Sequence, residues 1–117
     1  MTETQGFKVS AIGFGAIGER VVRALAAGEV PGAKLSGVVQ RTAGKAEAAG
    51  FQEVTLEDAI ASSDLVVECA GGEAARELGP QVIRGGADLL LVSVGVLADP
   101  HLRRVLLEEG PGRTYGS

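Results

Sequence analysis

The chain has 117 residues, 45% of them hydrophobic and 3% aromatic, and its formal net charge is −4. This length and the aliphatic composition suit a single domain over residues 1–117. The negative net charge offers no electrostatic support for binding DNA or RNA, so we expect no nucleic-acid partner. Because the chain has a single cysteine and a single histidine, it lacks a ligand set for zinc, and we expect no metal site.

No apolar run reaches the roughly 20 residues that a membrane-spanning helix needs. The polar first residues also lack a basic segment followed by an apolar one, which is the pattern of a signal peptide. We therefore expect a cytoplasmic location and no membrane partner.

Apolar runs typical of strands alternate along the chain with segments of helical spacing. We expect strands over residues 7–12, 34–40, 51–54, 64–70 and 87–94, and the start of another at 113–115. Helices are expected after residue 18 and over residues 43–49, 56–61, 73–84 and 100–109, with Gly79 and Pro80 kinking or dividing the fourth. This alternation predicts an α/β fold, a doubly wound parallel sheet with the first strand central and helices on both faces.

A glycine-rich segment, GFGAIG, lies between the first strand and the first helix and matches the pattern G-x-G-x-x-G. Gly13 permits a tight turn, Gly15 lets a pyrophosphate approach the backbone, and Gly18 lets the helix pack closely on the strand. The free amides at the helix start, where Ala16 and Ile17 stand, then face the pyrophosphate charge. The segment predicts a Rossmann-type dinucleotide site, and the alternative is an ordinary loop in a glycine-rich chain.

The end of the second strand indicates which dinucleotide binds. In NAD-binding domains, an acidic side chain at this place binds the ribose diol. This chain instead has Gln40, Arg41 and Thr42 there, followed by Lys45. These groups suit a 2′-phosphate, so we expect NADP or NAD with NADP slightly favoured. Alternatively, Arg41 and Lys45 are solvated surface charges, or the guanidinium stacks on adenine.

Small residues follow the fourth and fifth expected strands. Ligands of doubly wound sheets lie beyond the carboxyl ends of the strands, so Cys69, Ala70, Ser93 and Gly95 are candidates to contact the cofactor. The Ser93 hydroxyl is available to the nicotinamide carboxamide or to a substrate carboxylate, or else it bonds to a neighbouring carbonyl.

Three residues with reactive side chains give no catalytic prediction. Cys69 has no base close to it in sequence, so we interpret it as a small buried residue at a strand end. Glu68 points to a ribose or to a structural partner. His101 stands in the first turn of the last expected helix and is interpreted as a surface residue.

The segments GFGAIG, VVECAG and above all DLLLVSVGVLAD together resemble the N-terminal half of the L-aspartate dehydrogenase family. The resemblance covers residues 7–115, and Val96 departs from the small residue usual in that family. It implies an NAD(P)-dependent oxidation of L-aspartate to iminoaspartate, which yields oxaloacetate and ammonia on hydrolysis or enters nicotinamide cofactor synthesis.

The resemblance also implies what this chain lacks. In the family, a second half carries the substrate pocket, the catalytic histidine and the dimer contacts. We therefore expect residues 1–117 to be a dinucleotide-binding domain without the C-terminal catalytic and dimerisation domain, inactive alone and able to use L-aspartate only with that domain. Apolar surface near Val96, Leu97 and Tyr115 is expected to be exposed and to favour a homodimer.

Two other interpretations stay open. In the first, the chain is the cofactor half of another amino-acid dehydrogenase or reductase, similar to homoserine dehydrogenase or dihydrodipicolinate reductase. The VSVG-x-LAD segment argues against both of these enzymes. In the second, the chain is a stand-alone nucleotide-binding or regulatory module that binds a nucleotide and catalyses no reaction.

Overall fold

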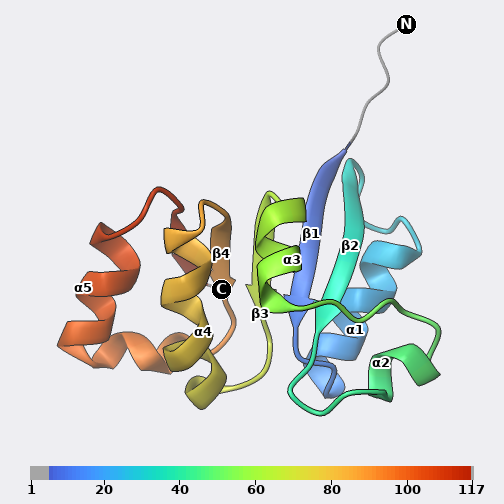
Figure 1. The fold of residues 1–117 in the computed structure, drawn as a ribbon, viewed down its shortest axis with the longest axis horizontal. Coiled ribbons are helices and arrows are strands. Elements are labelled where there is room, and N and C mark those ends of the chain that lie inside the picture. The colour runs from blue at the N-terminus through green and yellow to red at the C-terminus, as the bar shows by residue number, and fades with distance from the viewer. Residues whose placement is uncertain (1–5, 117) are drawn as a thin grey trace, which may run out of the picture.

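The computed structural model describes residues 6–116 and contains a five-stranded parallel sheet with helices on both faces (Figure 1). The elements in chain order are β1 (Phe7–Ile12), α1 (Ala16–Ala26), β2 (Ala33–Val39), α2 (Lys45–Ala48), α3 (Leu56–Ser62), β3 (Leu65–Glu68), α4 (Gly72–Arg84), β4 (Asp88–Leu91), the 3-10 helix η1 (Val94–Ala98), α5 (Pro100–Glu108) and β5 (Thr114–Gly116). The predicted α/β class and the short last strand are confirmed.

The strand order is β2-β1-β3-β4-β5, and every neighbouring pair is parallel. β1 lies inside the sheet, as predicted, because the chain adds β2 on one side of it and β3 on the other. The order of strands therefore reverses at β1. In doubly wound sheets, ligands bind in the crevice outside the carboxyl ends of the strands at such a point.

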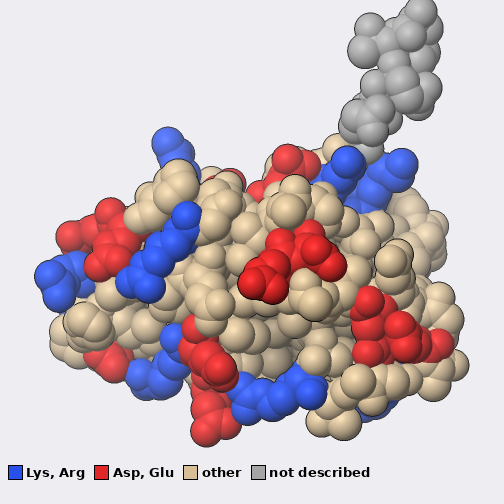
Figure 2. Space-filling view, viewed as in Figure 1, with Lys and Arg blue, Asp and Glu red and all other residues tan. Residues whose placement is uncertain are grey.

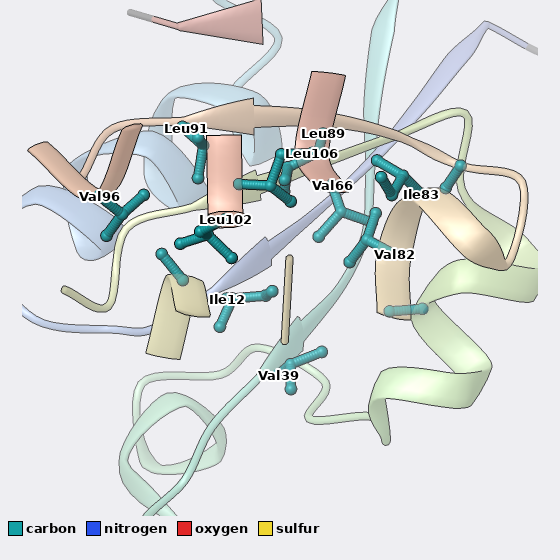
Figure 3. Close-up of a cluster of buried hydrophobic side chains, with 13 residues drawn as sticks. Ile12, Val39, Val66, Val82, Ile83, Leu89, Leu91, Val96, Leu102 and Leu106 are labelled. Carbon is teal, nitrogen blue, oxygen red and sulfur yellow. The ribbon is translucent and has the colours of Figure 1, made fainter. Parts of the chain in front are cut away.

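Hydrophobic clusters cover both faces of the sheet, because successive residues of a strand point to opposite faces. Val66 on β3 belongs to a cluster that packs against α3, α4 and α5, together with Leu89 and Leu91 of β4 (Figure 3). Its neighbour Val67 packs on the other face with Leu25 of α1. Burial of one such side chain contributes about 1.5–3 kcal/mol, so these clusters hold the helices on the sheet.

The segment at residues 51–54 does not form the strand that the sequence predicts. Only an isolated parallel bridge joins Glu53 to Val38 on the outer side of β2. The apolar residues of the segment pack away from each other, since Phe51 joins the cluster of Phe14 and Val54 joins the cluster under α3 and α4. The segment therefore covers the edge of β2 without extending the sheet.

The strands expected over residues 64–70 and 87–94 are shorter in the structure. β3 ends at Glu68, and β4 ends at Leu91 before η1 begins at Val94. The physical reason is the Glu68 side chain, which accepts hydrogen bonds from backbone amides beyond both strands, including that of Ser93. Those amides are bound to a carboxylate, so they do not continue the sheet.

The helix expected around Gly79 and Pro80 is not divided, because α4 runs through both residues. Gly79 instead allows close packing, because a Cβ there would lie 3.2 Å from Leu106 and 3.3 Å from Leu89. α4 therefore lies close to both β4 and α5.

The predicted apolar surface is only partly exposed. Val96 is buried at 4% exposure, so the prediction for this residue is wrong. It packs in the core cluster because η1 folds back over the start of α4, where a Cβ on Gly72 would lie 3.4 Å from the Val96 side chain. Leu97 is half-buried, whereas Tyr115 is exposed, as expected, at 48%.

Within residues 6–116, no helix combines the length and the apolar character needed to cross a membrane. In the same part of the chain, no three His, Cys, Asp or Glu side chains come together as a metal site would require.

Candidate functional site

The glycine-rich turn connects β1 to α1 at the point where the strand order reverses. Gly13 has a φ of 102°, which L side chains rarely adopt, and a Cβ on it would lie 3.0 Å from Ala70. Its amide donates to the carbonyl of Val39 over 2.8 Å, so the turn is held against β2. Gly18 is equally constrained, because a Cβ there would overlap the carbonyl of Gly13. Both positions therefore need glycine for the fold itself.

Gly15 differs from the other two glycines. A Cβ at Gly15 would meet no atom within 4 Å, so the missing side chain leaves open space beside the backbone. Gly15 is also the N-cap of α1, and no side chain caps this helix start. Ala16 and Ile17 follow in the first turn and are exposed. The positive end of the helix dipole thus faces open space, which suits an anion such as a pyrophosphate.

A cavity of about 560 Å³ opens beside this turn, at the carboxyl ends of β1 and β2 and against α4. Of the predicted site residues, it is lined by Gly13, Gln40, Arg41, Thr42 and Ala70. Sequence reasoning missed the rest of its apolar wall and two carboxylates. These further lining residues are Ile12, Phe14, Val39, Leu56, Ala74, Leu78, Glu73 and Glu77. We call this the first cavity.

The loop after β2 is held by its own hydrogen bonds. The Gln40 side-chain oxygen accepts from the amide of Ala46 over 2.8 Å, which places Gln40 in the support of α2. Glu53 accepts from the amides of Gly44, Ala46 and Glu47. These amide hydrogen bonds, Gly44 first, lower the pKa of Glu53 below its ordinary value. The loop that carries Arg41, Thr42 and Lys45 is therefore preorganised.

Arg41 reaches across the first cavity to α4. Its Nη1 donates to Glu73 Oε1 over 3.3 Å, and its Nη2 donates to Glu77 Oε1 over 3.1 Å. The Arg41 side chain is 60% exposed, so it is a solvated surface charge that two carboxylates also bind. Lys45 lines the same cavity.

A second cavity, of about 550 Å³, lies beyond the ends of β3 and β4. Two predicted residues, Ser93 and Gly95, line it together with Gly72, Glu73, Arg76 and Val96. Arg76 Nη1 donates to Asp99 Oδ2 over 2.9 Å. This hydrogen bond is the main cause that lowers the pKa of Asp99 below its ordinary value.

Glu68 ties the two strand ends together from inside the core. The side chain is fully buried, and its Oε2 accepts from the amides of Ala70 and Gly71 and from the Ser93 hydroxyl. Its Oε1 accepts from the amide of Ser93 over 2.9 Å. Glu68 therefore acts as a structural partner, one of its two predicted roles. The Ser93 hydroxyl donates to this carboxylate and not to a carbonyl, the alternative suggested by the sequence.

Neither Cys69 nor His101 lines either cavity. The half-buried Cys69 side chain packs with Val9, Leu25 and Val67 under α1. Burial, and secondly the charge of Glu68, raise the pKa of its thiol to about 11, so it is a poor nucleophile at neutral pH. His101 is exposed in the first turn of α5.

Comparisons with known proteins agree with this geometry. The family model described as the NAD binding domain of homoserine dehydrogenase matches residues 13–111. L-aspartate dehydrogenase from Methanothermobacter thermautotrophicus is 36% identical over 105 residues, which cover 86% of this chain and 40% of that protein. The chain thus spans less than half the length of this curated relative, and the resemblance seen in the sequence is confirmed.

Solved structures show the same fold. GenD2 from gentamicin A biosynthesis, in complex with NAD, matches with a TM-score of 0.78 and 24% identity, over 99% of this chain and 36% of that one. Aspartate dehydrogenase from Thermotoga maritima matches with a TM-score of 0.66 and 23% identity, over 94% of this chain and 45% of that one. The fold, the glycine-rich turn and the family match agree, and the chain belongs to the family of NAD-binding domains described for homoserine dehydrogenase.

Proposed function

We propose that this chain is the cofactor-binding part of an NAD(P)-dependent L-aspartate dehydrogenase, which converts L-aspartate to iminoaspartate. The observation that carries the proposal is the 36% identity with an L-aspartate dehydrogenase over 86% of the chain. The family description favours homoserine oxidation as a second candidate. We prefer L-aspartate because several L-aspartate dehydrogenases match most of the chain at 35–36% identity, whereas the family description covers only an NAD binding domain.

The described residues fit a bound dinucleotide. The open space at Gly15 and the uncapped start of α1 suit the pyrophosphate. In this proposal the first cavity binds the adenosine half, and the second cavity, beside Ser93 and Gly95, faces the nicotinamide half. When bound, the nicotinamide ring supplies the acceptor for the hydride. Ala70 and the backbone around Cys69 then border the path between the two halves.

This chain's own contribution is binding and orientation. Glu68 fixes the ends of β3 and β4, so the backbone that would meet the nicotinamide half is rigid. Hydride transfer also needs a substrate pocket and a general base, and His101 lines neither cavity. We infer that both come from a C-terminal catalytic and dimerisation domain, and that L-aspartate binds only in its presence.

For the cofactor, we propose NADP or NAD with NADP slightly favoured. The support is the end of β2, where Arg41 and Lys45 line the first cavity and no acidic residue stands. A homodimer and a cytoplasmic location also stay predictions. The dimer is supported by the exposed Tyr115 on β5, the last strand of the sheet.

Calorimetric titration of the purified chain with NADP and with NAD tests the proposal. We expect saturable binding of both at one site, and no reduction of either cofactor when L-aspartate is added. Absence of binding to both would contradict the cofactor role, and turnover by the chain alone would contradict the missing base. An assay of the full-length gene product tests the substrate, with L-aspartate expected to react and L-homoserine not.

A further inference from the structure

Two carboxylates of α4 accept hydrogen bonds from Arg41, the residue that we propose contributes to cofactor selection. Arg41 follows β2, whereas Glu73 and Glu77 lie one turn apart on α4. The hydrogen bonds of 3.3 Å and 3.1 Å come from different terminal nitrogens of Arg41, so each carboxylate engages its own donor. All three side chains line the first cavity, where Figure 2 shows acidic and basic side chains meeting at the lower edge between α4 and α2.

We propose that Glu73 and Glu77 are specificity-determining residues, which shift cofactor preference toward NAD by competing with a 2′-phosphate for Arg41. This inference rests on the proposed function, because it assumes that the adenosine half lies in the first cavity. Neither carboxylate stands at the end of the second strand, where the sequence motif places the acidic selector. The selector of this chain is therefore a pair of residues on a different element.

The chemistry of the guanidinium supports the competition. Arg presents its donors in one planar fork that matches carboxylate and phosphate alike. Two of the five N–H donors of Arg41 are bound to carboxylates, so a 2′-phosphate that binds both terminal nitrogens competes with these carboxylates. NAD carries a neutral hydroxyl at this place and does not compete in this way. The ion pairs thus lower the affinity for NADP and spare that for NAD.

The three side chains are exposed to solvent, so a 2′-phosphate can compete with the carboxylates for Arg41. The exposed fractions are 60% for Arg41, 89% for Glu73 and 64% for Glu77. Exposed ion pairs are weak and are replaced easily. Lys45, which also lines the cavity, forms none of the ion pairs found among residues 6–116. Arg41 therefore discriminates less than an unpaired arginine would, while Lys45 still offers a phosphate one cation.

The test is a set of titrations of wild type, Glu73→Gln, Glu77→Gln and the double variant with NADP and NAD. We expect the double variant to raise the ratio of NADP affinity to NAD affinity by about three- to tenfold, as loss of two exposed ion pairs predicts. Each single variant should give a smaller rise. Glu109→Gln is the matched control, because it removes a carboxylate from the distant ion pair with Arg84 and should not change the ratio.

The same substitutions in an Arg41→Ala background decide the mechanism. If the carboxylates act by holding Arg41, their replacement there leaves the ratio unchanged. An equal rise in both backgrounds would mean direct repulsion of the phosphate and would overturn the proposal. Binding of both cofactors with no change of the ratio in any Glu variant would also overturn it, while leaving the cofactor role intact. Binding of neither cofactor by the wild type would instead defeat the proposed function.

Two fragments locate the effect on the adenosine half. Adenosine 2′-monophosphate carries the discriminating phosphate, whereas adenosine 5′-monophosphate does not. The double variant should strengthen binding of the first relative to the second by the same factor as for the whole cofactors. A gain confined to the whole cofactors would place the effect elsewhere and contradict the role of Arg41.

Discussion

The Ser93 hydroxyl donates to Glu68 Oε2 over 2.8 Å and thereby joins the carboxyl ends of β4 and β3. Because Glu68 also accepts three backbone amides, one buried carboxylate sets the backbone beyond both strands. Within residues 6–116, no buried side-chain nitrogen or oxygen lacks a hydrogen-bond partner. Four hydrogen bonds thus satisfy the buried Glu68 carboxyl group, and none of the ion pairs found among residues 6–116 includes it.

Replacement of Glu68 by alanine should destabilise the fold. The change leaves three amides and one hydroxyl without their acceptor, and each buried unsatisfied group costs about 1–3 kcal/mol. We expect a loss of about 3 kcal/mol or more in the free energy of unfolding, measured by urea denaturation. Ser93→Ala removes only one donor and should cost much less. Equal losses for the two variants would contradict the central role of Glu68.

Substitutions at Gly15 and at Gly18 should have different effects, the first on cofactor binding and the second on the stability of the fold. Gly15→Val places a side chain in open space and should abolish most binding of NADP and NAD while the urea midpoint changes little. Gly18→Ala puts a methyl group against the Gly13 carbonyl, so it should lower the urea midpoint. Tight cofactor binding by Gly15→Val would refute the assignment of the pyrophosphate to this turn.

Replacement of Arg41 by alanine should lower the preference for NADP. One charge-assisted contact to a phosphate contributes roughly 1.5–3 kcal/mol, or about ten- to a hundredfold in affinity. Because Glu73 and Glu77 already engage the guanidinium, we expect the lower end, about tenfold, in the NADP-to-NAD affinity ratio. Equal losses for both cofactors would show that Arg41 stacks on adenine or supports the fold. A clear NAD preference of the wild type would refute the prediction that NADP is slightly favoured.

Asp99 should make stability fall in acid. Its pKa is lowered from the ordinary 3.8, first by the hydrogen bond from Arg76 and then by the amide of Leu102. A group with a depressed pKa in the folded state stabilises above its unfolded pKa, and this contribution disappears as the pH falls through the folded value. Asp99→Asn should therefore show a smaller drop in melting temperature below pH 3.8 than the wild type. An unchanged acid profile would contradict the ion pair.

Tyr115 should affect self-association. It is 48% exposed on β5, which lies at the end of the sheet. Exposed apolar patches and open strand edges favour pairing. We expect sedimentation velocity to show a dimer that Tyr115→Lys weakens, whereas Leu107→Lys on α5 serves as a control. A monomer at all concentrations would count against the homodimer.

Features that depend on residues close together in the chain could be predicted from the sequence. The apolar run at residues 7–12, the glycine spacing after it and the caps of the helices are local signals, and β1, the turn and α5 lie where these signals predict. Asp99, for example, caps α5 by accepting from the amides of His101 and Leu102. The resemblance in the strand-end segments rests on the same short stretches.

Contacts between residues far apart in the chain could not be predicted in this way. Glu68 and Ser93 are 25 residues apart in the chain, and Arg41 and Glu77 are 36 apart. No local pattern connects such pairs, because their distance depends on the strand order and on the position of α4 over the sheet. For the same reason, the ends of β3 and β4, the burial of Val96 and the reduction of residues 51–54 to a single bridge escaped prediction. Long-range hydrogen bonds and packing, not local propensity, determine where those segments stop.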